Sequence, residues 1–178
     1  MTLIAHTLHH RIPFLIGDIL FTSKAGDESI TLPTALGDTQ HLLKELPYKP
    51  ALYSQKVYVI KPNLIIGLAG SGSEMKDFLK EFRVQCCYYD KMTFNDLMRI
   101  IGDYDKDKLF KESAFIASLV EKENGRVQVR SVVYPENDWI DQKTDMFENI
   151  AACGTGDADF CYHAGKLGDF SAMAEVGS

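Results

Sequence analysis

The sequence lacks the features that mark several classes of protein. No apolar stretch approaches the length of a membrane span, and the start has no basic segment followed by an apolar block and a small-residue cleavage site. It also lacks an excess of basic residues, because 19 lysines and arginines face 25 aspartates and glutamates, for a formal net charge of −6. We therefore expect a cytoplasmic protein that binds neither nucleic acid nor a membrane.

Cysteine is scarce, and its spacing is not that of a metal site. The four cysteines are Cys86, Cys87, Cys153 and Cys161, and neither the adjacent pair nor the wider pair matches a zinc pattern. Without a secretory signal, buried free thiols are the simplest interpretation.

Three histidines near the start, His6, His9 and His10, raise the possibility of a metal cluster. On a strand, His6 and His10 would share one face while His9 points to the other. A metal site needs a ligand number and geometry that this arrangement does not supply. We predict no metal and no cofactor, with metal binding by these histidines as the minor alternative.

We expect one domain, because 178 residues with 46% apolar content suffice for a substantial core. Residues 24–50 are polar and interrupted by glycine and proline, which predicts an insertion with a short helix at Thr39–Leu46. Asn124-Gly125 predicts a hairpin turn. Apolar runs predict strands at 3–8, 12–22, 56–60, 64–69, 114–121, 127–134 and 148–152.

Helices are predicted between these strands and after the last one. Ser73 is expected to cap the first helix, whose core stripe is Met75, Phe78, Leu79 and Phe82. Thr93 is expected to cap the second, whose stripe is Phe94, Leu97, Met98 and Ile101. A third is expected to end near Lys166. Strands and helices come in blocks, which favours an α+β fold with antiparallel sheets covered by helices.

Thr2 directly follows the start methionine. A small residue at this place lets an aminopeptidase remove Met1, and Thr2 would then carry both a hydroxyl and a free α-amine. The unperturbed pKa of that amine is about 8, which suits a general base. A threonine with its own N-terminal amine is a known activated nucleophile.

Three blocks of residues follow one another along the chain. They are Thr2 with Gly17-Asp18 and Thr22; Ser54-Gln55-Lys56 running through Pro62 to Gly67-Leu68-Ala69-Gly70; and Ala151-Ala152-Cys153-Gly154-Thr155-Gly156. In this order and spacing they resemble the N-terminal nucleophile (Ntn) hydrolases of the proteasome β-subunit and bacterial proteasome-like peptidase type, and the resemblance covers about residues 2–23 and 51–167.

The resemblance implies catalytic roles for five residues. Thr2 would be the nucleophile, and its amine the proton acceptor. Lys56 would lower the pKa of the nucleophile, and Asp18 would pair with and orient that lysine. The backbone N–H of Gly70 would stabilise the oxyanion. Thr155 stands where the family has a serine that hydrogen-bonds near the N-terminal amine.

The resemblance also implies how substrate is bound. Thr22 would lie beside an extended substrate strand. Phe21 and Leu68 occupy positions that line the primary specificity pocket of the family, and two bulky apolar walls predict a preference for small-to-medium apolar residues.

The same residues also allow simpler interpretations. Asp18 could be a turn residue, Lys56 an exposed strand residue, and Thr155 a helix cap. Gly70-Ser71-Gly72-Ser73 before a helix could bind phosphate, although it lacks the Lys-Ser/Thr ending of a Walker A loop.

As a whole, the resemblance implies a four-layer αββα sandwich, with two antiparallel sheets between helix layers, formed by a single domain over residues 1–178. The implied activity is hydrolysis of peptide or other amide bonds by Thr2, without a metal or organic cofactor. Family members form rings, so the resemblance implies a homo-oligomer.

Three departures from the family pattern keep two other functions open. The segment between Thr22 and Lys56 is longer than expected, and Leu20 stands where an arginine is usual. The C-terminal part is shorter, and Asp169-Phe170-Ser171 is not at the distance of the further aspartate and serine of the family. The alternatives are a catalytically inactive Ntn-fold subunit with an assembly role, and a small-molecule amidase whose site the 24–50 insertion covers.

Overall fold

The computed structural model describes residues 3–9, 12–24, 48–104, 113–134, 139–141, 151–154 and 162–163. In these residues the labelled helices are α2 (Gly72–Cys87) and α3 (Phe94–Asp103), and residues 162–163 are also helical. The strands are β1 (Ile4–His9), β2 (Ile12–Gly17), β3 (Leu20–Lys24), β4 (Tyr48–Tyr53), β5 (Val57–Lys61), β6 (Leu64–Gly70), β7 (Ser113–Glu123), β8 (Arg126–Tyr134), β9 (Trp139–Asp141) and β10 (Ala151–Cys153).

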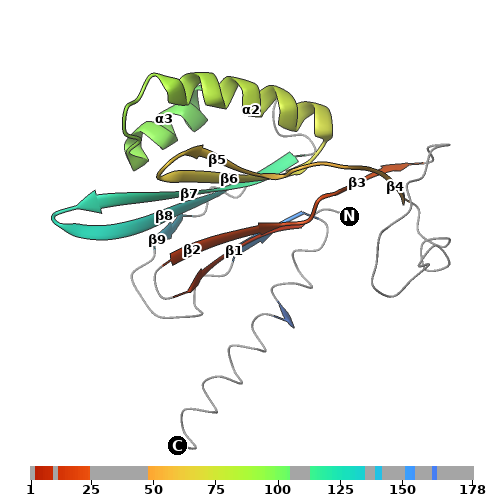
Figure 1. Ribbon diagram of the computed structural model, residues 1–178, viewed down its shortest axis with the longest axis horizontal. Coiled ribbons are helices and arrows are strands. Elements are labelled where there is room, and N and C mark those ends of the chain that lie inside the picture. The colour runs from red at the N-terminus through yellow and green to blue at the C-terminus, as the bar shows by residue number, and fades with distance from the viewer. Residues whose placement is uncertain are drawn as a thin grey trace, which may run out of the picture.

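The described strands form antiparallel sheets. The largest has the order β5-β6-β7-β8-β9, the second the order β10-β1-β2, and β3 pairs with β4. Helices α2 and α3 cover one face of the five-stranded sheet, and β1 and β2 lie beneath its other face (Figure 1). No described helix is long and apolar enough to cross a membrane.

One part of the core lies between the five-stranded sheet and the two helices. The predicted stripe of α2 is buried there, and Phe78 of that stripe stacks on Phe115 of β7 with ring centroids 5.3 Å apart. Leu97 of α3 joins the same cluster, while Met98 is only partly buried. The helical spacing of the apolar residues therefore correctly predicted which face of each helix meets the sheet.

The second part of the core lies between the two larger sheets. Ile4 of β1 and Cys153 of β10 meet Ala69, Ile116 and Val133 of the five-stranded sheet. A helix layer and two sheet layers are thus present among the described residues. The second helix layer of the predicted four-layer sandwich would fall outside those residues, so the full sandwich stays a prediction.

Local sequence signals placed several elements correctly. The turn between β7 and β8 lies at Asn124-Gly125, where φ is 50° and 79°. Both residues are in the left-handed region, which a two-residue hairpin turn of this kind requires. Thr93 caps α3 as predicted, because its side chain accepts from the Asp96 backbone N–H while the Asp96 side chain accepts from the Thr93 N–H.

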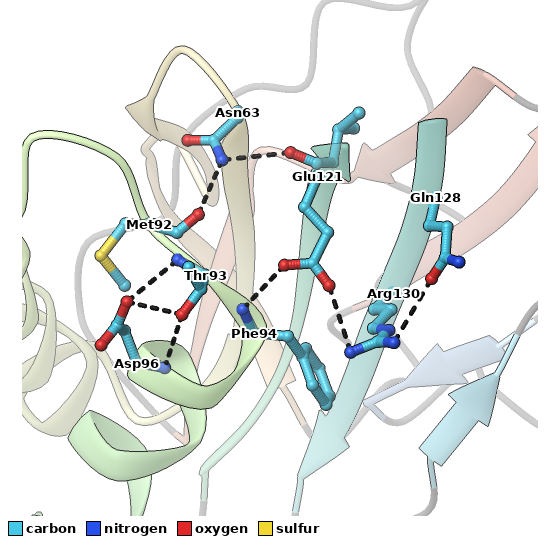
Figure 2. A network of polar contacts seen from close by, with 9 residues as sticks. Asn63, Met92, Thr93, Phe94, Asp96, Glu121, Gln128 and Arg130 are labelled. Carbon is cyan, nitrogen blue, oxygen red and sulfur yellow. Dashed lines mark hydrogen bonds and ion pairs between the residues drawn. The ribbon is translucent and has the colours of Figure 1, made fainter. Parts of the chain in front are cut away.

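A polar network joins the start of α3 to the sheet, and Figure 2 shows its members pointing toward one another. Glu121 of β7 accepts a hydrogen bond from the backbone N–H of Phe94 at 3.1 Å, and its other oxygen lies 3.1 Å from Arg130 Nη1. Asn63, at the β5–β6 turn, donates to the carbonyls of Met92 and Val120. The network therefore ties α3 to the turn end of the β5–β6 hairpin.

Several boundaries differ from the predictions. The strand predicted at 12–22 is two strands, β2 and β3, because the chain leaves the first sheet at Asp18. Residues 48–50, predicted as part of the insertion, belong to β4, which pairs with β3 across a bulge. Helix α2 begins at Gly72 with Ser71 at its N-cap position, not at Ser73.

Further differences concern β9, one cysteine and the last helix. Strand β9 was not predicted. Cys86 and Cys153 are buried as expected, but Cys87 is exposed. The helix predicted at Thr39–Leu46 and most of the one predicted after Gly156 lie outside the described residues.

Candidate active site

The lysine and the aspartate singled out in the sequence meet near the start of β5 and the end of β2. Lys56 Nζ lies 2.6 Å from Asp18 Oδ1. The Lys56 side chain is 0% exposed, whereas that of Asp18 is 33% exposed. Burying an ammonium is costly unless a charged partner and hydrogen bonds compensate. The position of this cation therefore depends on the carboxylate beside it.

The same carboxylate binds the N-terminal strand. The Leu3 backbone N–H donates to Asp18 Oδ2 at 2.5 Å, and the Asp18 backbone N–H donates to the Leu3 carbonyl at 3.1 Å. Asp18 thus connects the lysine to the residue that directly follows Thr2 in the sequence. Thr2 itself lies outside the described residues.

Two glycines fix the depth at which the N-terminal strand sits. A Cβ added to Gly17 would lie 2.7 Å from Ile4 Cδ1, and one added to Gly67 would lie 2.5 Å from Ile4 Cγ2. Real side chains do not come this close, so a side chain at either position would force Ile4 or its neighbours to shift. The contact was missed in the sequence, where the two glycines are 50 positions apart.

Gly70 lies at the same end of the five-stranded sheet as Lys56. The Leu68 N–H donates to the Lys56 carbonyl at 2.9 Å, and Gly70 ends the same strand two residues later. Its φ of 116° is in the left-handed region, which favours glycine. Its role as an oxyanion donor stays a prediction.

A hydroxyl and a carboxylate that the sequence did not single out hold the turn after Gly70. The Ser71 N–H donates to Ser113 Oγ at 3.2 Å, and the Ser113 hydroxyl donates to Glu74 Oε2 at 2.6 Å. These bonds link β7 to the first turn of α2. No sequence signal pairs residues this far apart.

The predicted substrate-binding residues are placed differently from one another. The Phe21 ring centroid lies 4.6 Å from Lys56 Nζ. Leu68 is buried in the core between sheet and helices. Thr22 lies in β3 opposite Pro50, and its side chain is not among those described. The substrate roles of all three stay predictions.

A hollow of about 380 Å³ opens beside the ion pair. Ile19 and Tyr53 expose apolar surface there. The Ser54 N–H donates to the Ile19 carbonyl at 2.9 Å and joins the chain after Asp18 to the segment before Lys56. The hollow is lined by Gly17, Ile19, Tyr53, Ser54, Gln55, Lys56 and Val57.

His6 and Cys86 are chemically active side chains that lie in the interior. His6 is buried between the sheets, where its Nε2 lies 3.1 Å from Ser131 Oγ. Burial raises the pKa of the Cys86 thiol to about 11, so this cysteine stays protonated at neutral pH. Among the residues described, no three histidine, cysteine, aspartate or glutamate side chains are grouped to hold a metal. His10 and Thr155 lie outside this part of the chain.

Comparison with known proteins gives a likeness in structure. No protein-family model matches the chain, and no curated protein matches its sequence. The solved structure of eukaryotic HslV from Trypanosoma brucei matches with a TM-score of 0.52 and 13% sequence identity, over 88% of this chain and 74% of that chain. The chain is similar in fold to HslV. At this identity the likeness concerns the fold alone, an α+β arrangement of antiparallel sheets and helices.

Proposed function

We propose that this protein hydrolyses peptide or other amide bonds with Thr2 as its nucleophile, exposed by removal of Met1. One observation above all supports this proposal. A single carboxylate, that of Asp18, accepts from the Lys56 ammonium with one oxygen and from the Leu3 N–H with the other. A buried positive charge and the start of the chain are therefore tied to the same group.

The proposed chemistry combines these contacts with the roles that the family resemblance implies. The α-amine of Thr2 accepts the hydroxyl proton as the hydroxyl oxygen attacks the substrate carbonyl. Lys56 favours the deprotonated oxygen through its charge, and the Gly70 N–H donates to the oxyanion. The protonated amine then gives its proton to the leaving amine, and water hydrolyses the resulting ester by the same route.

The end of strand β10 supports a further part of the site. Cys153 is the partner of Ile4 in the antiparallel ladder between β10 and β1. In the sequence, Thr155 comes two positions after Cys153 and Thr2 two positions before Ile4, and both residues lie outside the described part of the chain. We assign Thr155 the task of hydrogen bonding near the Thr2 amine. The homo-oligomer implied by the family resemblance belongs to the same proposal.

The test combines mass spectrometry with one substitution. Intact-mass measurement of the native protein should show loss of Met1, which the mechanism requires. Thr2→Ala should then fold normally and lose cleavage of fluorogenic peptides, while Thr2→Ser should retain part of it. An electrophilic boronate or epoxyketone should modify the wild type at residue 2. Retained Met1, or a fully active Thr2→Ala variant, would show that Thr2 is not the nucleophile.

A further inference from the structure

Phe21 lies against the buried ammonium of Lys56. It is the second residue of β3, which begins two residues after Asp18, where the chain leaves the sheet of β1 and β2. Its ring centroid is 4.6 Å from Lys56 Nζ, while the other cation–aromatic pairs of the described residues span 5.2 to 5.5 Å. A cation within about 6 Å of a ring face is attracted by the ring electrons, and most strongly where water is absent.

The ring also packs against the hydrophobic core. Phe21 packs against the core beneath α2, and a Cβ added to Gly72 would lie 3.4 Å from Phe21 Cε1. The first residue of α2 therefore lies close to the ring, at a separation that a methyl group would fill. Lys56 accordingly has the carboxylate of Asp18 and a partly buried aromatic ring as neighbours.

We propose that Phe21 is a positioning residue for Lys56 and not chiefly a wall of the specificity pocket. Its ring keeps water from the ammonium and holds Nζ at Asp18. A charge in such a dry site acts more strongly on neighbouring groups than a hydrated one. This inference rests on the proposed function, in which Lys56 activates Thr2. The competing explanation is that Phe21 only fills space beside the helix.

A series of fluorinated rings separates the two explanations. Replacing Phe21 by 4-fluoro-, 3,5-difluoro- and 3,4,5-trifluorophenylalanine nearly preserves its shape while weakening its attraction for a cation. We expect kcat to fall stepwise along the series, by about three- to tenfold at its end, with KM unchanged. A space-filling role predicts a constant kcat, and that result would overturn the proposal.

The pH profile gives a second readout. A nearby positive charge lowers the pKa of the Thr2 amine, because it disfavours the protonated form. In Phe21→Leu the ammonium becomes hydrated and less fixed, so the pKa of the amine should rise. The acidic limb of kcat/KM should therefore move to higher pH. An unshifted limb would contradict the assignment.

Phe94→Leu is the matched control. Phe94 is buried and lies under the Arg130 guanidinium at 5.2 Å, at the turn end of the β5–β6 hairpin. The same loss of a ring beside a cation should lower the melting temperature there and leave kcat and its pH profile unchanged.

A double-mutant cycle tests the contact without using activity. Phe21→Leu and Lys56→Met, singly and together, should be non-additive by about three- to tenfold in the equilibrium constant for unfolding. Additive effects would mean that the ring does not hold the ammonium. If the wild type cleaves no amide while the cycle shows coupling, the proposed function fails and the contact between Phe21 and Lys56 stands. The fluorinated series keeps the test decisive if Lys56→Met does not fold.

Discussion

The two ends of the β5–β6 hairpin both hold charged side chains, and they do so in different ways. At the turn end, Glu121 and Arg130 pair at 3.1 Å with 13% and 29% of their side chains exposed. Glu121 also accepts from the start of α3, and Arg130 also contacts Gln128. At the other end, the Lys56 side chain is fully buried beside Asp18 and under the Phe21 ring.

The difference in burial between the two charged pairs indicates that one is a stabilising network and the other a candidate site. Charges that keep contact with water and share several partners can lose one of them at little cost. A cation removed from water depends on the carboxylate that faces it, and proteins bear that cost mostly where the charge has a task. The turn end therefore serves the fold, whereas the Lys56 end is where we propose that the chemistry takes place.

The largest effect is expected from the same carboxylate-to-amide change made at each end. Asp18→Asn removes the negative charge that faces a buried ammonium, which should lower the free energy of unfolding by about 3–5 kcal/mol and abolish turnover. Glu121→Gln should cost about 1 kcal/mol at most, with kcat unchanged, because Arg130 is partly solvated. Urea unfolding and a peptidase assay check both variants. Equal losses of stability would remove the contrast between the two ends.

A smaller loss of stability is expected from a substitution at the contact between Ile4 and Gly67, where the two sheets meet. Gly67→Ala would place a methyl group 2.5 Å from Ile4 Cγ2, so we expect a loss of about 1–3 kcal/mol and reduced activity as the N-terminal strand shifts. Ile4→Leu lacks that branched methyl, and the double variant should recover part of both losses. If Ile4→Leu gives no recovery, the N-terminal strand is not positioned by this contact.

Short-range patterns predicted the parts of the fold that depend on neighbouring residues. The stripe of α2, the Thr93 cap and the Asn124-Gly125 turn are each decided within a few positions of the chain, and all three are confirmed. The end of β2 at Asp18 could not be predicted from neighbouring residues. It depends on Leu3 and Lys56, which are distant in sequence and meet only when the sheets pack.

The features of the candidate site likewise fall into those predicted from the sequence and those that depend on packing. The family resemblance singled out Asp18 and Lys56, and the structure contains their ion pair. The contact of Gly67 with Ile4 and the placement of Phe21 on Lys56 were not predicted, because they depend on how two sheets and a helix pack together. Strand β4 was missed because Pro50, which lacks a backbone N–H, argued against a strand, and it is accommodated beside a bulge.

A moderate loss of stability is expected at the turn end when the cap of α3 is removed. Thr93→Ala removes the hydroxyl that accepts from the Asp96 N–H, at the start of α3. Losing such a cap costs about 1 kcal/mol. We expect a lower melting temperature and an unchanged kcat, and Thr93→Ser should restore most of the stability. A fall in kcat at constant stability would show that the network of Figure 2 influences the chemistry at the Lys56 end.

The smallest expected change in stability comes from replacing one glycine in each helix by alanine. Gly102, in α3, has nothing within 4 Å of an added Cβ, so Gly102→Ala should raise the free energy of unfolding by about 0.4–1 kcal/mol through helix propensity alone. Gly72 is the first residue of α2, so Gly72→Ala should give a smaller helical gain, plus an ordinary contact with the Phe21 ring at 3.4 Å. A gain in the free energy of unfolding, measured by urea unfolding, that exceeds that of Gly102→Ala would therefore report that contact. If Gly72→Ala is destabilised while Gly102→Ala is stabilised, the ring of Phe21 is packed too tightly on α2 to accept a methyl group. The position of the ring beside Lys56 would then be more constrained than the 3.4 Å distance indicates.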